Sequence, residues 1–214
     1  MSFAIVIYTV IFYLAWALVE LVVYPALTPI TNAETAEIIK EVLIKNVLWT
    51  IPALLLIKKY EANIRISLKE MFTSKVNWFK FMPVFMVFAV YILGQKYLYS
   101  GTVGLNEGVS FAGIIPYLFA GLTEEVVFRG WLLNAMTFNR KEYLMVVINA
   151  IMFLLIHFPV WIRTGIFVYA FTSFGVVIII TLSIIFSICF LRSRNILVPI
   201  VLHSFWDVLL YLVG

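Results

Sequence analysis

Residues 111–133 read FAGIIPYLFAGLTEEVVFRGWLL, and this stretch decides how the chain must fold. It is apolar and long enough to cross a bilayer, which takes ~20 residues in a helix. It nevertheless contains Glu124, Glu125 and Arg129. Each ionisable side chain at the centre of a membrane helix costs ~2.5–3.5 kcal/mol on insertion scales, so each of the three needs a partner or a function. The stretch therefore predicts a membrane helix that carries a polar site.

The composition of the whole chain is that of a membrane protein. Apolar residues make up 64% of the 214 residues, against ~45–50% in soluble domains, and charged residues make up 12%, against ~25%. Such a chain has too little polar surface for a soluble enzyme and too many apolar residues for a disordered protein. The net charge of +4 is typical of basic cytoplasmic loops, and we expect no nucleic-acid partner. A single cysteine, Cys189, excludes an internal disulfide.

Further apolar runs lie on both sides of this stretch. We expect an all-α, polytopic integral membrane helix bundle of about seven transmembrane helices, or eight if the long sixth run breaks near Gly175. The first run has no basic segment before it and no good cleavage site, so we interpret it as a retained helix. The predicted spans are residues 3–23, 46–57, 81–94, 111–133, 143–162, 166–191 and 196–213.

Two segments between the spans have patterns of their own. Thr31 and Glu34 have the spacing of a capping box and open an amphipathic stretch that leads into the second span. Residues 58–80 combine six basic residues with scattered apolar ones, which predicts an interfacial helix on an anionic leaflet. We treat the chain as one membrane domain, with N-terminal helices and this interfacial segment in residues 1–110 and a candidate catalytic core in residues 111–214.

Basic residues are unevenly divided between alternate loops. With the seven spans above, 11 Lys and Arg residues fall on one side and 4 on the other, namely Lys40, Lys45, Lys96 and Arg163. Because basic loops stay in the cytoplasm, this split predicts a cytoplasmic N-terminus and a C-terminus outside. We expect a multi-pass protein of the cell membrane whose environment is the lipid bilayer.

Ionisable residues within the apolar runs form the most informative set. Both histidines of the chain and its only aspartate belong to it. A single buried histidine is usually structural, but two histidines together with carboxylates and an arginine in three late spans favour a functional cluster. The set consists of Glu20, Glu124, Glu125, Arg129, His157, His203 and Asp207.

Helix geometry separates the two neighbouring glutamates. Glu125 and Arg129 are four residues apart and share a helix face, which suits an ion pair. Glu124 points about 100° away from Glu125, so it is free to face a cavity. A buried carboxylate of this kind suits a general base.

The two histidines come from other spans than the glutamates, and we expect them to complete the cluster. His203 and Asp207 are also four residues apart, so Asp207 either orients His203 or shares a water or a metal with it. His157 comes from another span.

Missing motifs exclude several classes of enzyme. The chain has no H-E-x-x-H zinc helix, no G-x-S-x-G serine motif, no P-loop and no G-x-G-x-x-G. A single aspartate rules out a two-aspartate protease. The remaining hypotheses are an intramembrane endopeptidase, a non-catalytic membrane immunity or regulatory protein, and an ion-coupled transporter. The lack of repeated halves disfavours the transporter.

Three short motifs follow one another in the late apolar runs. They are E-E-x-x-x-R at 124–129, F-x-x-x-H at 153–157 and H-x-x-x-D at 203–207. Their types and order resemble the motifs of the CPBP family, which comprises the type II CAAX prenyl endopeptidases and the bacteriocin-processing Abi proteins. The resemblance covers residues 111–214, and residues 1–110 carry no family motif.

The resemblance implies an intramembrane endopeptidase that acts on a membrane-embedded peptide or protein. Carried over, Glu124 is the general base that activates water. Glu125, Arg129 and Phe153 support it, and His157 and His203 help to bind water, an oxyanion or a metal.

The resemblance leaves the cofactor open. Asp207 stands where the eukaryotic CAAX enzymes have asparagine, and a carboxylate cannot donate a hydrogen bond unless it is protonated. Asp207 therefore belongs to the candidate catalytic set with an orienting or metal-binding role. If zinc is bound, the implied ligands are His157, His203 and either Glu124 or Asp207. We favour a resting site without metal to which a metal can optionally bind, because no single helix carries the two-histidine motif of tight zinc sites.

Overall fold

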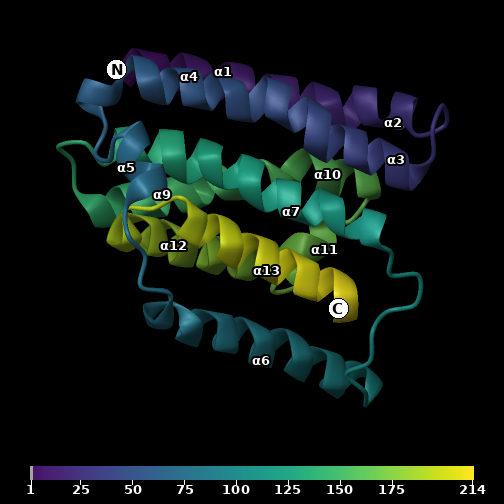
Figure 1. Ribbon diagram of the computed structural model, residues 1–214. Helices are drawn as coiled ribbons and strands as arrows, with labels where there is room; N and C mark the ends of the chain where they lie inside the picture. The colour runs from purple at the N-terminus through teal and green to yellow at the C-terminus, as the bar shows by residue number, and fades with distance from the viewer. Residues whose placement is uncertain (1) are drawn as a thin grey trace.

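The computed structural model describes residues 2–214, and all its regular elements are helical (Figure 1). Long helices lie side by side, with α1 and α4 along one edge, α7 through the middle, and α6 along the other edge next to α13. Their bounds are α1 Ser2–Leu18, η1 Val19–Val23, α2 Tyr24–Leu27, α3 Ala33–Ile38, η2 Ile39–Ile44, η3 Asn46–Thr50, α4 Ile51–Lys59, η4 Glu61–Asn63, α5 Leu68–Thr73, η5 Trp78–Lys80, α6 Met82–Ser100, α7 Phe111–Glu125, η6 Val126–Leu133, α8 Asn134–Met136, α9 Glu142–Leu155, α10 His157–Thr164, α11 Phe167–Thr172, α12 Gly175–Ser193 and α13 Leu197–Val213.

Within residues 2–214, five helical stretches are long and apolar enough to cross a membrane, which confirms the predicted all-α, polytopic membrane fold. The other two predicted spans correspond to the helical stretch 33–59, which carries charges, and to α13, which is apolar but shorter. The count of seven spans stays a prediction. The five stretches are Phe3–Leu27, Met82–Ser100, Phe111–Met136, Glu142–Thr164 and Gly175–Ser193.

The predicted sixth span is interrupted where the sequence suggested. Helix α11 ends at Thr172 and α12 begins at Gly175. With six residues, α11 is far too short to cross a bilayer, so the interruption adds no eighth span.

Two local predictions in the N-terminal half are wrong. Residues 58–80 do not form one interfacial helix. They comprise the last two residues of α4, the short helix α5 and two single 3₁₀ turns, with non-helical residues between them. The helix after residue 31 is capped by Asn32, whose side chain accepts from the Thr35 amide at 2.8 Å, and not by a Thr31–Glu34 box. Thr31 instead donates its hydroxyl to the carbonyl of Leu27.

The loops gather at two ends of the bundle. At one end, the side chain of Asn134 exchanges two 2.8 Å hydrogen bonds with the backbone of Ile66, and Asn195 donates to the carbonyl of Ser74. We call this the basic end, because the segments 58–80, 140–141 and 192–194 meet there. At the opposite end, Asn106 donates to the carbonyl of Gly214.

Burial of two lysines corrects the charge count. Lys40 and Lys45 lie inside the bundle with 4% and 3% of their surface exposed, so they are not loop residues as the sequence suggested. Arg129 is buried as well. Without these three, the basic end holds ten Lys and Arg residues against two at the opposite end. The corrected count still favours a cytoplasmic basic end.

Wide π-helical turns interrupt the long helices at several of the buried charges. Glu20 lies in η1, and Lys40 and Glu41 lie in η2. Arg129 lies in η6, which begins directly after Glu125. Such turns are rare in proteins, and those that do occur are often at functional sites. They mark the part of the bundle where polar side chains from several helices converge.

The central helix α7 packs closely against α13 at Gly121. A Cβ atom added there would lie 2.3 Å from the Ser204 hydroxyl oxygen and 2.9 Å from the Ser204 backbone nitrogen. Only a residue without a side chain lets the two backbones approach in this way. This approach brings Glu124 and Glu125 next to the histidine of α13.

We expect Gly121→Ala to destabilise the purified protein, because the added methyl group must push α7 and α13 apart. Overpacking of this kind costs about 1–3 kcal/mol, which lowers the midpoint of thermal unfolding by several degrees. Gly94→Ala in α6 is the matched control, since nothing lies within 4 Å of its added Cβ. Equal midpoints for the two variants in the same detergent would show that the contact does not constrain the helices.

The basic end also gives a topology prediction. A reporter inserted in the 60–67 loop should report a cytoplasmic location, and one inserted at Glu107 should report the other side, because these loops lie at opposite ends of α6. A cytoplasmic reading at Glu107 contradicts the predicted orientation.

Candidate active site

The pair Glu125–Arg129 forms the fully buried centre of the site. The Arg129 Nη1 atom lies 2.9 Å from Glu125 Oε1, as the four-residue spacing predicts. The Nη2 atom donates to the carbonyl and the hydroxyl of Ser183 in α12, at 2.9 and 2.7 Å. The guanidinium lies 4.6 Å from the ring centroid of Phe153 in α9. One arginine therefore joins α7 and η6 to two neighbouring helices.

His203 of α13 lies among three carboxylates. Its Nδ1 atom is 2.8 Å from Glu125 Oε1, and its Nε2 atom is 3.3 Å from Asp207 Oδ2 and 4.0 Å from Glu124 Oε2. The ring stacks on Phe186 with centroids 4.9 Å apart. An ionised carboxylate only accepts hydrogen bonds, so both ring nitrogens face acceptors. The contact between His203 and Asp207 is the one that their four-residue spacing predicts.

His157 begins α10 at a break in the helix. Pro159 follows two residues later and cannot donate a backbone hydrogen bond, which explains why α9 ends at Leu155. The indole of Trp16 in α1 donates to the carbonyl of Ile156 at 2.9 Å. The Nδ1 atom of His157 lies 3.1 Å from the carbonyl of Phe153, so Nδ1 carries the proton and Nε2 keeps its lone pair in a neutral ring.

Lys45 contacts Glu124 directly, and this contact corrects the sequence analysis. The Lys45 Nζ atom lies 2.8 Å from Glu124 Oε1 and 2.6 Å from Glu41 Oε2. Glu124 is therefore not the unpartnered carboxylate that the helix geometry suggested. The four-residue spacing of Glu41 and Lys45 was a signal for a charged helix face, but no local pattern showed that Glu124 lies opposite.

A chain of alternating charges continues from Lys45 toward the opposite end. Lys40 Nζ lies 3.5 Å from Glu41 Oε1 and 3.0 Å from Glu20 Oε1. Arg163 Nε lies 2.9 Å from Glu20 Oε2. Glu20, which had no assigned role in the sequence, thus neutralises two basic residues. Together these contacts pair the buried charges of α1, η2 and α10.

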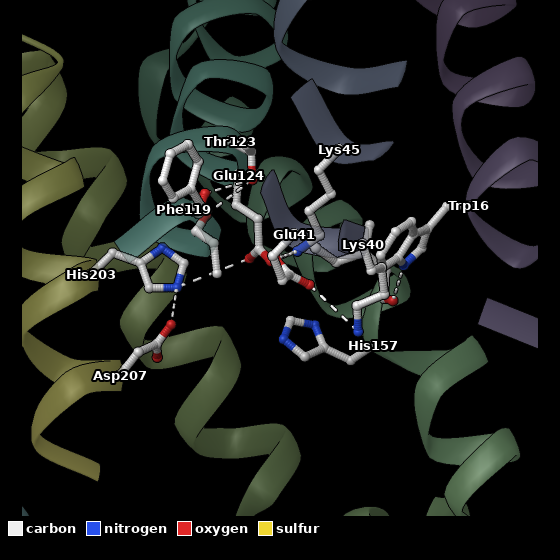
Figure 2. Close-up of polar contacts among 12 residues, drawn as sticks. Trp16, Lys40, Glu41, Lys45, Phe119, Thr123, Glu124, His157, His203 and Asp207 are labelled. Carbon is white, nitrogen blue, oxygen red and sulfur yellow. Dashed lines mark hydrogen bonds and ion pairs between the residues drawn. The ribbon is translucent and has the colours of Figure 1, made fainter. Parts of the chain in front are cut away.

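Figure 2 shows Glu124 between the two halves of the site. His203 and Asp207 lie on one side of its carboxylate, Lys45 lies on the other, and His157 approaches from α10. The seven predicted residues Glu124, Glu125, Arg129, Phe153, His157, His203 and Asp207 thus come together around α7 and η6.

Two cavities meet the site from different sides. A large cavity of about 650 Å³ runs between α6, α11, α12 and α13 and reaches His157, His203 and Asp207. A small one of about 120 Å³, with mostly charged walls, lies on the Lys45 side of Glu124. The ring of His157 lines both.

The described residues do not fit a zinc site. In residues 2–214, no three His, Cys, Asp or Glu side chains are arranged so that they could hold a metal ion together. The Lys45 ammonium already supplies a positive charge to Glu124 at 2.8 Å, where it would repel a cation.

One comparison with known proteins gives a match. Residues 106–209 match the family model described as Type II CAAX prenyl endopeptidase Rce1-like, and this stretch contains all three motifs. No curated protein and no solved structure matches the chain. The family match supports neither metal dependence nor bacteriocin processing. Residues 106–209 are therefore a domain of the Rce1-like type II CAAX prenyl endopeptidase family.

Proposed function

We propose that this protein is an intramembrane endopeptidase that hydrolyses a peptide bond of a membrane-associated peptide or protein with a water molecule activated by Glu124. One observation carries the proposal. The Glu124 carboxylate is buried within a membrane helix, yet it lies between Lys45 and His203 instead of being neutralised by Arg129. A paired carboxylate that also faces an imidazole is suited to proton transfer.

In the proposed reaction, Glu124 takes a proton from water while the water oxygen bonds to the carbonyl carbon of the substrate. Glu125 holds the Nδ1 atom of His203, and the Nε2–H, which faces Asp207 in the resting site, turns to donate to the oxygen on which negative charge develops. The carbon–nitrogen bond then breaks, and the proton held by Glu124 passes to the leaving amine. His157 lies beside both cavities, where its Nε2 lone pair can accept a hydrogen bond from the same water.

The large cavity suits an apolar substrate. Its walls include Tyr91, Trp161 and Trp206 together with aliphatic side chains of α12. Apolar and aromatic walls bind an apolar or lipid-modified peptide by removing its surface from water. We propose a prenylated or otherwise apolar peptide as the substrate, cleaved in the cell membrane with the basic end in the cytoplasm.

Glu124→Gln should abolish cleavage, because an amide cannot take the proton from water. We expect a loss of at least about 100-fold in kcat, the usual contribution of a general base. The measurement uses purified protein in lipid nanodiscs and an internally quenched peptide with a farnesylated CAAX end. Glu107→Gln in a loop is the control. Cleavage by Glu124→Gln at the rate of the wild type contradicts the proposed role.

Glu125→Gln should act mainly on stability. Arg129 would remain buried and would lose the carboxylate that faces it, and leaving such a charge unpaired typically costs about 3–5 kcal/mol. Glu142→Gln is the matched control, because it breaks a surface pair with Arg65 that is worth less than about 1 kcal/mol. Thermal unfolding in detergent compares the two. If both variants unfold at the temperature of the wild type, the buried pair does not stabilise the fold.

A further inference from the structure

The helical stretch 33–59 inserts a lysine into the site from outside the matched family domain. Lys45 comes from this stretch, whereas the match covers residues 106–209. Its side chain is 3% exposed, and Glu124 and Glu41 are its two ionic partners. A buried lysine in a membrane bundle costs free energy unless its charge is used. Pairing within its own stretch would need only Glu41, so the contact with Glu124 calls for a separate explanation.

Four groups surround the ammonium of Lys45. Its Nζ atom lies 2.6 Å from Glu41 and 2.8 Å from Glu124, and it lies over the rings of Trp16 and Trp49 at 5.1 and 4.7 Å from their centroids. Cation–π contacts of this kind hold a buried ammonium group over the faces of aromatic rings. An ammonium group with contacts on four sides has a defined position, and it therefore defines the position of the carboxylate oxygen that it binds. We call it the anchor of Glu124.

The anchor distinguishes the two oxygens of Glu124. Oε1 is 2.8 Å from Lys45, whereas Oε2 is 4.0 Å from His203 Nε2. The first oxygen is thus bound, and the second faces the imidazole across a gap longer than a hydrogen bond. A carboxylate held by one oxygen presents the other in a defined direction.

We propose that Lys45 is a positioning residue that fixes Glu124 through Oε1 and leaves Oε2 to accept the proton of the hydrolytic water. The inference rests on the proposed function of Glu124. It makes the stretch 33–59 a part of the active site, although this stretch carries none of the three motifs. Glu41 holds Lys45 in place from the same helix, one turn away.

The test compares substitutions of the two buried lysines. Lys45→Met should lower kcat about 100-fold, the effect of misplacing a catalytic group by ~1 Å, and should change KM less than twofold. Lys45→Arg should restore most of the kcat, because it returns a cation to the same carboxylates. Lys40→Met is the matched control. It removes a neighbouring buried lysine that pairs with Glu20, Glu37 and Glu41 but not with Glu124, and it should keep the kcat of the wild type.

A purely structural role for Lys45 predicts a different pattern. In that case Lys45→Met would lower the unfolding temperature, but the folded fraction would cleave the farnesylated peptide at the kcat of the wild type. That result overturns the inference. If Lys45→Met does not fold, the charge-balanced variant Lys45→Met/Glu41→Gln is measured instead, and Lys45→Arg is measured in either case. A kcat of the wild type in the charge-balanced variant, or a kcat in Lys45→Arg as low as that of Glu124→Gln, also overturns it.

The Glu124→Gln variant separates this inference from the proposed function. If Glu124→Gln is inactive and Lys45→Met is fully active, Glu124 acts without the anchor and only the inference fails. If Glu124→Gln remains active, the general-base role fails, and the inference fails with it.

Discussion

The electrostatic cost of charge in hydrocarbon determines how this bundle is assembled. Arg129 and Glu125 are both fully buried, so neither can be ionised in lipid without the other. Both residues of the pair also contact other helices. Glu125 is hydrogen-bonded to His203 of α13. Arg129 contacts Ser183 in α12 and Phe153 in α9. The geometry of the candidate site is therefore a consequence of neutralising one arginine. The same constraint explains why the charges of η1 and η2 alternate in sign.

Contacts within one helix were predictable from the sequence, because helix geometry alone determines them. Glu125 and Arg129, and likewise His203 and Asp207, are four residues apart, and both pairs are in contact in the structure. The all-α membrane fold followed from apolar runs of sufficient length. The order of the three motifs also indicated the family that the comparison then showed. Each of these predictions uses information that lies within one short stretch of sequence.

Contacts between distant helices were not predictable in this way. Lys45 and Glu124 are 79 residues apart, and their pairing depends on which helices become neighbours. The charges of the stretch 33–59 lowered its hydropathy, so two lysines were assigned to a loop although they are buried. Wide π-helical turns have no simple sequence pattern either. The basic segment 58–80 is not one helix, and its backbone bonds to distant residues: Arg65 and Ile66 bond to Asn134, and Met71 bonds to Ile196.

The hydrogen bond from Trp16 to the carbonyl of Ile156 has a consequence for biogenesis. Its partners are 140 residues apart, and the ribosome makes α1 long before α10. Glu20, Lys40 and Lys45 are synthesised just as early, whereas Glu124 and Arg163, which neutralise some of them, come much later. The early helices must therefore stay beside the insertion machinery, or in contact with one another, until the later ones arrive. The site is thus completed late in translation, and a chain that stalls before α10 keeps the pair of Glu20 with Lys40 but lacks Arg163, His157 and His203.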